Sequence, residues 1–325
     1  QRIVKFNYHG SASETACIVA LQLIDGVGNS TINKIISTPT YDLSAGFKSF
    51  YSCYLALKAI HRNIPDIEDK ELEAIYDESI EVLQNQDELG IKTISRFDKK
   101  YPVGLSLLPS PPPLIHFKGN IDALNQKNVA VVGSRKMSRG TDNQINKLVS
   151  ECVKNDFNIV SGLALGVDTI AHKVTLENRG TTIAVMAHGL ETIAPSSNRS
   201  LANKIIANNG CLFSEYFIGT PPSAANYITR NSLQVAISIA VIIGEAHKNS
   251  GTIETAKQAF KQGKLLGCLP VTNDNTSNYT AFDFLANDLK ATTLNSGESK
   301  NEFFEKIESY KIIPATKTNE QLNLF

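Results

Sequence analysis

The sequence lacks any apolar run approaching the ~20 residues that a membrane-spanning helix needs. The start of the chain, Gln1 to Gly10, also lacks the apolar core behind a basic segment that marks a secretory signal. We therefore expect a cytoplasmic protein that does not bind membranes.

An excess of positive charge is missing as well. The 32 Lys and Arg residues balance 32 Asp and Glu residues, so the formal net charge is zero. The chain as a whole does not attract a polyanion, and any nucleic-acid site has to be a local patch. At 325 residues the chain is long enough for two or three domains.

Cysteines are few and odd in number, and they lie far apart, often inside apolar runs. Neither a disulfide framework nor a zinc site has such spacing. We predict buried thiols at all of them: Cys17, Cys53, Cys152, Cys211 and Cys268.

Residues 1–90 are predicted to form a small all-helical domain. Gly26 and Gly28 interrupt an apolar helix, and helical spacing resumes at Thr31. A Gly-x-Gly turn between two helices can bring backbone N–H groups to a phosphate, as in a helix-hairpin-helix module, or can be a plain connection. The spacing leaves both readings open. Farther on, Asp66 to Gln86 has the pattern of an amphipathic helix whose acidic face would repel DNA.

The pattern changes after this helix. Leu107 to Pro113 is proline-rich and cannot be helical, which indicates a junction between domains. We assign residues 91–119 to a linker and lead-in, and residues 120–310 to a second domain.

The second domain alternates apolar runs with amphipathic helices. Near-continuous apolar strands separated by helices predict an α/β fold with a doubly wound, mostly parallel Rossmann-like sheet, covered on both faces. The expected strands are 128–133, 157–161, 182–186, 211–214, 239–243 and 265–269. The expected helices are 141–155, 167–178, 199–208, 227–237 and 252–262. Right-handed crossovers place the turns that follow these strands at one edge of the sheet, where ligands bind.

Three of these turns have residues suited to a phosphate. Glycine permits close approach, a guanidinium matches phosphate oxygens, and a helix N-terminus offers free N–H groups. A single Gly-Ser-Arg turn is better explained as a plain tight turn, and coincidence could explain each of the three turns alone. For Asp168, which follows the second turn, the more common role is that of an N-terminal capping or dipole-compensating residue. Their shared edge favours a phosphate-bearing ligand. The predicted contacts are Gly133, Ser134, Arg135 and Lys136, then Ser161, Gly162 and Gly166, and finally Ser250, Gly251 and Thr252.

A further segment combines an aromatic ring with a positive charge where a loop enters a helix. Tyr227 could stack on a base while Arg230, followed by Asn231, pairs with a phosphate. The equally weighted alternative is a packing tyrosine and a surface salt bridge. The turns do not match the G-x-G-x-x-G fingerprint, so no dinucleotide cofactor is expected.

In this order, the motifs resemble the DprA/Smf family of DNA-processing proteins. The collinear blocks are Val129 to Arg135, Ser161 to His172, Thr182 to Pro195 with Asn198 and Leu201, Ser214 to Asn231, and Glu245 to Gly263. The resemblance implies a homodimer that binds single-stranded DNA in a positive pocket, displaces single-strand-binding protein and loads the RecA recombinase during natural transformation. It assigns phosphate contact to Arg135 and maps the aromatic residue and arginine before the late helix to Tyr227 and Arg230. It also implies that the N-terminal helices form a sterile-alpha-motif-type unit.

The chain departs from the family motif at two places. Ser232 replaces a basic residue, which removes one expected contact with DNA, and the segment that continues from it reads Leu233-Gln234-Val235-Ala236 instead of Ile-Ile-Ala-Gly. Glu254 places a carboxylate near the expected pocket. This glutamate motivates a rival hypothesis, a LOG-type phosphoribohydrolase that cleaves the N-glycosidic bond of a nucleotide, but its register relative to Gly251 differs by one residue from that motif. A nucleotide-sensing defence protein is a third reading.

No catalytic residue and no metal site are expected. His172, His188 and His247 lie near the sheet edge without a paired nucleophile or metal-ligand spacing, so we predict structural roles for them. We therefore expect a binding protein without turnover.

Residues 311–325 form a tail too short for the winged-helix domain that ends many family members. Gln321 to Phe325 resembles the short peptides that dock on the replicative sliding clamp by burying a leucine and a phenylalanine. The alternative, with equal weight, is a tail that folds back on its own domain.

Overall fold

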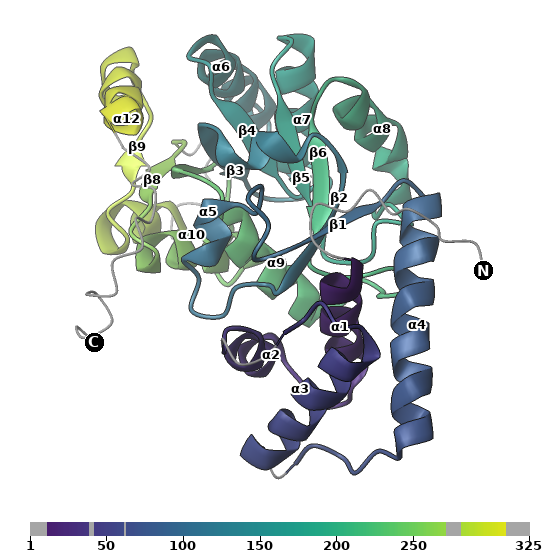
Figure 1. Cartoon of the computed structure of the whole chain (residues 1–325). Helices are drawn as coiled ribbons and strands as arrows, with labels where there is room; N and C mark the ends of the chain where they lie inside the picture. Colours follow the sequence, from purple (N-terminus) through teal and green to yellow (C-terminus); the bar gives the residue numbers. More distant parts are fainter. Residues whose placement is uncertain (1–11, 39–41, 62, 271–280, 310–325) are drawn as a thin grey trace.

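The computed structural model describes residues 12–38, 42–61, 63–270 and 281–309. In these residues an N-terminal group of helices packs beside a large sheet that carries helices on both faces (Figure 1). The predicted tail, with its clamp-type peptide, lies outside the described residues. None of the described helices is both long and apolar enough to cross a bilayer.

The N-terminal helices are α1 (Ala12–Leu23), α2 (Asn29–Ile36), α3 (Phe47–Ile60) and α4 (Asp69–Glu88). They surround an apolar core that includes Phe50, Leu57 and Leu72, each with no exposed surface. The acidic amphipathic helix expected from the sequence is α4. Leu114, from the next part of the chain, completes this core and ties the helices to the sheet.

The strands are β1 (Lys92–Ser95), β2 (Leu114–Gly119), β3 (Asn128–Val132), β4 (Asn158–Ser161), β5 (Thr182–Val185), β6 (Cys211–Ser214), β7 (Ala240–Ile243), β8 (Leu265–Cys268) and β9 (Thr292–Thr293). Within the described part of the chain they form one sheet in the order β1-β2-β6-β5-β4-β3-β7-β8-β9. The pairs β1–β2 and β2–β6 are antiparallel, and all others are parallel. The doubly wound α/β fold predicted from the sequence is confirmed.

Helices cover the two faces of the sheet as separate layers (Figure 1). One layer contains α6 (Thr141–Lys154), α7 (Val167–Glu177) and α8 (Arg199–Ala207). The other contains the short α5 (Val103–Ser106), α9 (Ala224–Ala236) and α10 (Gly251–Lys261). Every residue of β3, β4, β5, β6 and β7 is buried, because a parallel sheet covered on both faces leaves no side for polar residues.

The region expected to be a linker, 91–119, differs from that expectation. It contributes two strands, and β2 pairs with β6 through registers such as His116 with Ser214. The proline-rich crossing precedes β2 and ends where Leu114 enters the sheet. The sequence did not reveal these strands because they are short and partly polar, and because β2 pairs with a strand far along the chain.

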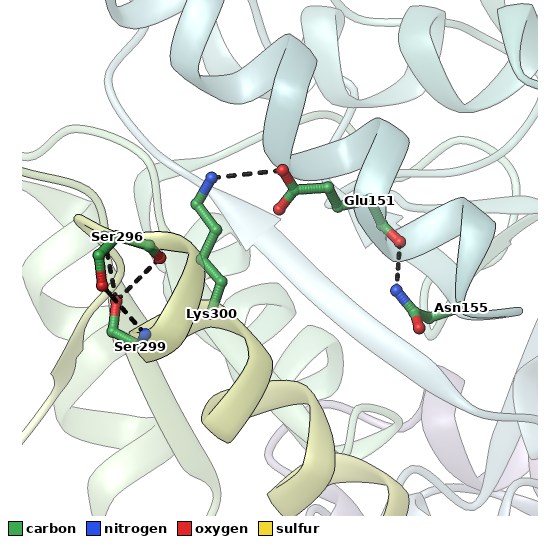
Figure 2. A network of polar contacts seen from close by, with 5 residues as sticks. All are labelled: Glu151, Asn155, Ser296, Ser299 and Lys300. Atoms are coloured by element: carbon green, nitrogen blue, oxygen red, sulfur yellow. Dashed lines mark hydrogen bonds and ion pairs between the residues drawn. The ribbon is translucent and has the colours of Figure 1, made fainter.

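The last described helix, α12 (Gly297–Ser309), packs through Phe304 against the connection between α6 and β4, where the ring centroid of Phe157 is 6.0 Å from that of Phe304. Figure 2 shows the polar contacts at its start. Ser296 and Ser299 cap the helix reciprocally, with backbone N–H to side-chain oxygen distances of 3.2 and 3.1 Å. Lys300 then forms an ion pair of 3.4 Å with Glu151 of α6.

The Gly26–Gly28 turn faces the sheet domain. Asn29, the first residue of α2, donates a hydrogen bond of 3.0 Å to Glu215, which follows β6. The Glu215 side chain is mostly buried, and burial raises the pKa of its carboxyl group. A carboxylate beside this turn repels phosphate, so the structure favours a plain, docked connection over a helix-hairpin-helix phosphate site.

Candidate functional site

A cavity of about 270 Å³ opens at the carboxyl ends of β3 and β7, between α9 and the N-terminal turns of α10. We call it the strand-end pocket. Its lining includes the predicted residues Gly133, Ser134, Arg135, Tyr227, Arg230, Asn231, Ser250, Gly251 and Thr252. It also includes Val132, Ala164, Asp168, Gln234, His247 and Thr255. The structure therefore brings the first and third turns and the aromatic–arginine segment into one place.

Four predicted residues do not line this pocket: Lys136, Ser161, Gly162 and Gly166. Lys136 is exposed beside the first turn. Ser161 has no exposed surface, and its hydroxyl donates to the Val131 carbonyl at 2.8 Å. Its hydroxyl is thus used within the sheet.

Gly166 and Gly162 are required by packing. A Cβ atom on Gly166 would lie 2.3 Å from the Ser134 carbonyl oxygen, and Gly166 has a φ of +78° that L-residues rarely adopt. A Cβ atom on Gly162 would lie 1.9 Å from Nη1 of Arg230. These glycines let the second turn pack against the first turn and against the arginine, which differs from their expected role of admitting a ligand.

Hydrogen bonds to Glu245, which follows β7, hold the first turn in place. The Ser134 N–H donates to the Glu245 carbonyl oxygen at 2.8 Å. The Glu245 carboxylate accepts hydrogen bonds from the Ser138 N–H at 2.9 Å and from the Thr141 hydroxyl at 2.6 Å. With the backbone held, the exposed side chain of Arg135 extends from a rigid base toward the pocket.

Arg230 is buried, with only 6% of its surface exposed. Its Nη1 donates to the carbonyl oxygens of Gly162 at 2.8 Å and Val185 at 2.7 Å, which joins the ends of β4 and β5. The guanidinium therefore supports the floor of the pocket in addition to lining it. The sequence left open a surface salt bridge for Arg230, but the residue is buried and its guanidinium donates to backbone carbonyl oxygens instead.

Asp168 is the acidic partner in this buried region. Its carboxylate accepts the N–H groups of Gly162 at 3.1 Å and Ala164 at 3.3 Å. Burial raises the pKa of Asp168 and lowers that of Arg230, and the attraction between the two charges opposes both changes. Asp168 lies in the first turn of α7 and the N-cap is Gly166, so of the two roles expected from the sequence its position fits dipole compensation and not capping.

Tyr227 lies beside both arginines. The ring centroid is 5.5 Å from Cζ of Arg135 and 5.5 Å from Cζ of Arg230. Such distances are typical of cation–π contacts. The aromatic ring and the two positive charges thus form one group, with Tyr227 only partly exposed.

Gln234 and His247 are among the pocket residues that were not predicted as contacts from the sequence. Gln234 follows Arg230 by four positions and Tyr227 by seven, so helical periodicity alone would have placed it on the same face of α9. His247, for which a purely structural role was expected, is partly exposed and its Nε2 is 3.8 Å from Oε1 of Glu245.

Of the departures from the family motif, Ser232 and Glu254 lie outside the pocket lining, whereas Gln234 lies in it. Glu254 is about half exposed and pairs with Lys257 at 2.7 Å. The Ser232 hydroxyl accepts a hydrogen bond of 3.3 Å from Gln262. The carboxylate therefore does not add a negative charge to the lining, and the hydrolase hypothesis finds no support in its position.

The other two histidines singled out from the sequence, His172 and His188, are buried. The Thr182 hydroxyl donates to the Ile159 carbonyl, so Nδ1 of His172, at 2.7 Å, has to donate to the Thr182 oxygen. Burial lowers the pKa of His172 to about 3. Among the described residues there is no group of three His, Cys, Asp or Glu side chains that could hold a metal ion, and all five cysteines are buried free thiols, as predicted.

A family model described as DNA recombination-mediator protein A matches residues 92–305. The chain belongs to this family. The resemblance to the DprA/Smf family stated from the sequence is thereby confirmed.

Individual relatives agree with this assignment. DNA processing protein DprA of Streptococcus pneumoniae is 36% identical over 178 residues, which are 55% of this chain and 62% of that protein. The Bacillus subtilis protein of the same name is 32% identical over 201 residues, covering 62% of this chain and 67% of the relative. These matches thus extend over about two thirds of the relatives.

Solved structures extend the similarity to more of the chain. The X-ray structure of DprA from S. pneumoniae has a TM-score of 0.70 and 26% identity, and covers 88% of this chain and 95% of its own. A Helicobacter pylori DprA structure, described for its single-stranded DNA binding mode, has a TM-score of 0.58 and 28% identity, covering 68% and 97%.

Proposed function

We propose that the strand-end pocket binds the backbone of single-stranded DNA. The observation that carries this proposal is the convergence of Arg135, Tyr227 and the N-terminus of α10 on one cavity. A guanidinium and free helix N–H groups suit a phosphate, and a partly exposed ring suits a base. The H. pylori relative described with single-stranded DNA supports the same ligand class.

The local origin of the charge explains how a chain with zero net charge binds a polyanion. Arg135, Lys136 and Arg139 are exposed on the loop after β3, and Arg135 lines the pocket. The acidic helix α4 belongs to the N-terminal group of helices. The strand-end side therefore favours DNA more than the acidic helix α4 does.

The test is a fluorescence-anisotropy titration of the full chain with labelled oligo-dT at several salt concentrations, compared with Arg135→Ala. We expect salt-dependent binding that weakens in the variant, with a salt slope shallower by about 0.7 for one lost phosphate contact. Absence of binding by the wild-type chain, or an unchanged affinity in Arg135→Ala, would contradict the proposal.

Family membership supports the finer parts of the proposal. We infer that the protein acts without turnover as a homodimer in the cytoplasm, and that it displaces single-strand-binding protein and loads RecA in natural transformation or recombination. A sliding-clamp contact through Gln321 to Phe325 is a separate proposal. RecA filament assembly on DNA coated with single-strand-binding protein, with and without this chain, tests the loading step: no acceleration would contradict it.

A further inference from the structure

A buried amide in the strand-end pocket has an unused hydrogen-bond donor. Gln234 is only 2% exposed, yet Nε2 has no hydrogen-bond partner among the residues that the structure describes. Its side chain lines the cavity together with Arg135 and Arg230. An unpaired buried donor costs about 1–3 kcal/mol, so a side chain in this position points to a ligand that completes it.

A second unused donor, Ser250, lines the same pocket just before α10. Ser250 is the N-cap of this helix, but its side chain forms no capping hydrogen bond. Its Oγ is buried and has no partner in the described part of the chain. The next residues, Gly251 and Thr252, line the pocket with the first N–H groups of α10, which have no carbonyl partner within a helix. Amide, hydroxyl and backbone donors therefore surround the same cavity.

We propose that Gln234 and Ser250 bind a phosphate oxygen of the DNA as a neutral donor pair, an inference that rests on the proposed DNA-binding function. A phosphate offers only acceptors, which matches a lining composed of donors. Asp168, the carboxylate in the lining, is already engaged by two backbone N–H groups and by the nearby charge of Arg230. The pair thus supplies hydrogen bonds to the ligand without adding charge.

A neutral contact has a distinct signature in salt. Lysine and arginine contacts release counterions from DNA, so their contribution decreases as the salt concentration rises. Gln234 and Ser250 carry no charge and release none. Their contribution to affinity should therefore be the same at every salt concentration.

The experiment measures the binding of labelled oligo-dT by the full chain across salt concentrations. Gln234→Met keeps the length of the side chain and removes the donor. We expect about tenfold weaker binding at each salt concentration, with the wild-type slope. Arg135→Ala, in contrast, should reduce the slope by about 0.7. Gln144→Met, at a glutamine on α6 that does not line the pocket, is the matched control and should bind like the wild type.

Ser250→Ala is the second, independent variant. Because Ser250 forms no capping bond, we expect the Ser250→Ala protein to keep the wild-type melting temperature. Its affinity for oligo-dT should fall with an unchanged salt slope. This variant keeps the test decisive if Gln234→Met folds poorly.

Outcomes separate the two proposals. If the wild-type chain does not bind oligo-dT, the proposed function fails. If it binds and Arg135→Ala weakens it, but Gln234→Met and Ser250→Ala bind like the wild type, only the neutral donor pair is wrong. The neutral donor pair would also be wrong if Gln234→Met and Ser250→Ala reduced the salt slope of binding as much as Arg135→Ala does.

Discussion

The guanidinium of Arg230 occupies the space that a side chain on Gly162 would need. A Cβ atom there would lie 1.9 Å from Nη1 and 2.5 Å from Cζ, while Nη1 donates to the Gly162 carbonyl oxygen at 2.8 Å. The glycine and the arginine therefore form one unit at the end of β4. The glycine-rich turn after β4 leaves space for the buried side chain of Arg230 from α9.

Replacing Gly162 by alanine should displace the arginine. We expect Gly162→Ala to lower the free energy of unfolding by about 1–3 kcal/mol, as overpacking does, and to weaken oligo-dT binding because the pocket floor shifts. Urea unfolding and anisotropy measure the two effects. Gly297→Ala is the control, because a Cβ atom at Gly297 meets no atom within 4 Å. Equal stability of the two variants would contradict this role of Gly162.

Stability should fall in acid because of two buried histidines. Burial lowers the pKa of His116 and of His172 from 6.5 to about 3. Their stabilising contribution is complete above pH ~6.5 and is lost as the pH falls toward 3, because the unfolded chain then binds protons that the folded chain does not. For each unit by which the pH falls in this range, each histidine should lower the free energy of unfolding by about 1.4 kcal/mol.

The measurement for the histidines is urea unfolding between pH 7 and pH 5, compared with His172→Gln. The buried carboxyl groups of Asp168 and Glu215 have raised pKa values and act in the opposite direction, but they are common to both proteins, so the difference between them isolates the histidine. An identical pH dependence in wild type and variant would show that His172 does not contribute.

Glu254 should be dispensable for binding. Its carboxylate pairs with Lys257 on the surface of α10, and such exposed pairs contribute about 0–1 kcal/mol. We expect Glu254→Gln to keep the oligo-dT affinity within about fivefold. Incubation with nucleoside monophosphates, followed by chromatography for free base, tests the rival activity. Release of base by the wild type that stops in Glu254→Gln would establish the hydrolase reading.

The docking of the N-terminal helices depends on Asn29. Asn29→Asp would place a second carboxylate against the buried Glu215, and we expect a loss of about 1–3 kcal/mol in the free energy of unfolding. Asn146→Asp, at an exposed asparagine on α6, serves as the comparison. If both changes cost the same, the contact between Asn29 and Glu215 does not support the docking.

The sequence predicted strands β3 to β8 well because each is a near-continuous apolar run, but it did not predict the short polar strand β9. The helix that carries Tyr227 and Arg230 begins at Ala224, a few residues earlier than expected, since Ser223 caps it through the Asn226 N–H. The antiparallel strands β1 and β2 were missed because β2 pairs with the distant β6 and β1 pairs with β2, and no local pattern reveals this pairing. For the site, charge and glycine spacing indicated residues that line the pocket. They did not indicate that Arg135 is exposed whereas Arg230 is buried and supports the pocket floor.

Strand β2 also determines where the chain can be divided into separate fragments. A fragment that begins after residue 119 would expose the backbone of β6, which pairs with His116 to Gly119, and an uncovered strand edge promotes aggregation. A fragment that ends before β2 would lack Leu114, whose side chain fills the core of the helices. Deletion studies that separate the two halves should therefore keep β1 and β2 on the fragment with the sheet, and supply a polar residue where the helices lose their apolar cover.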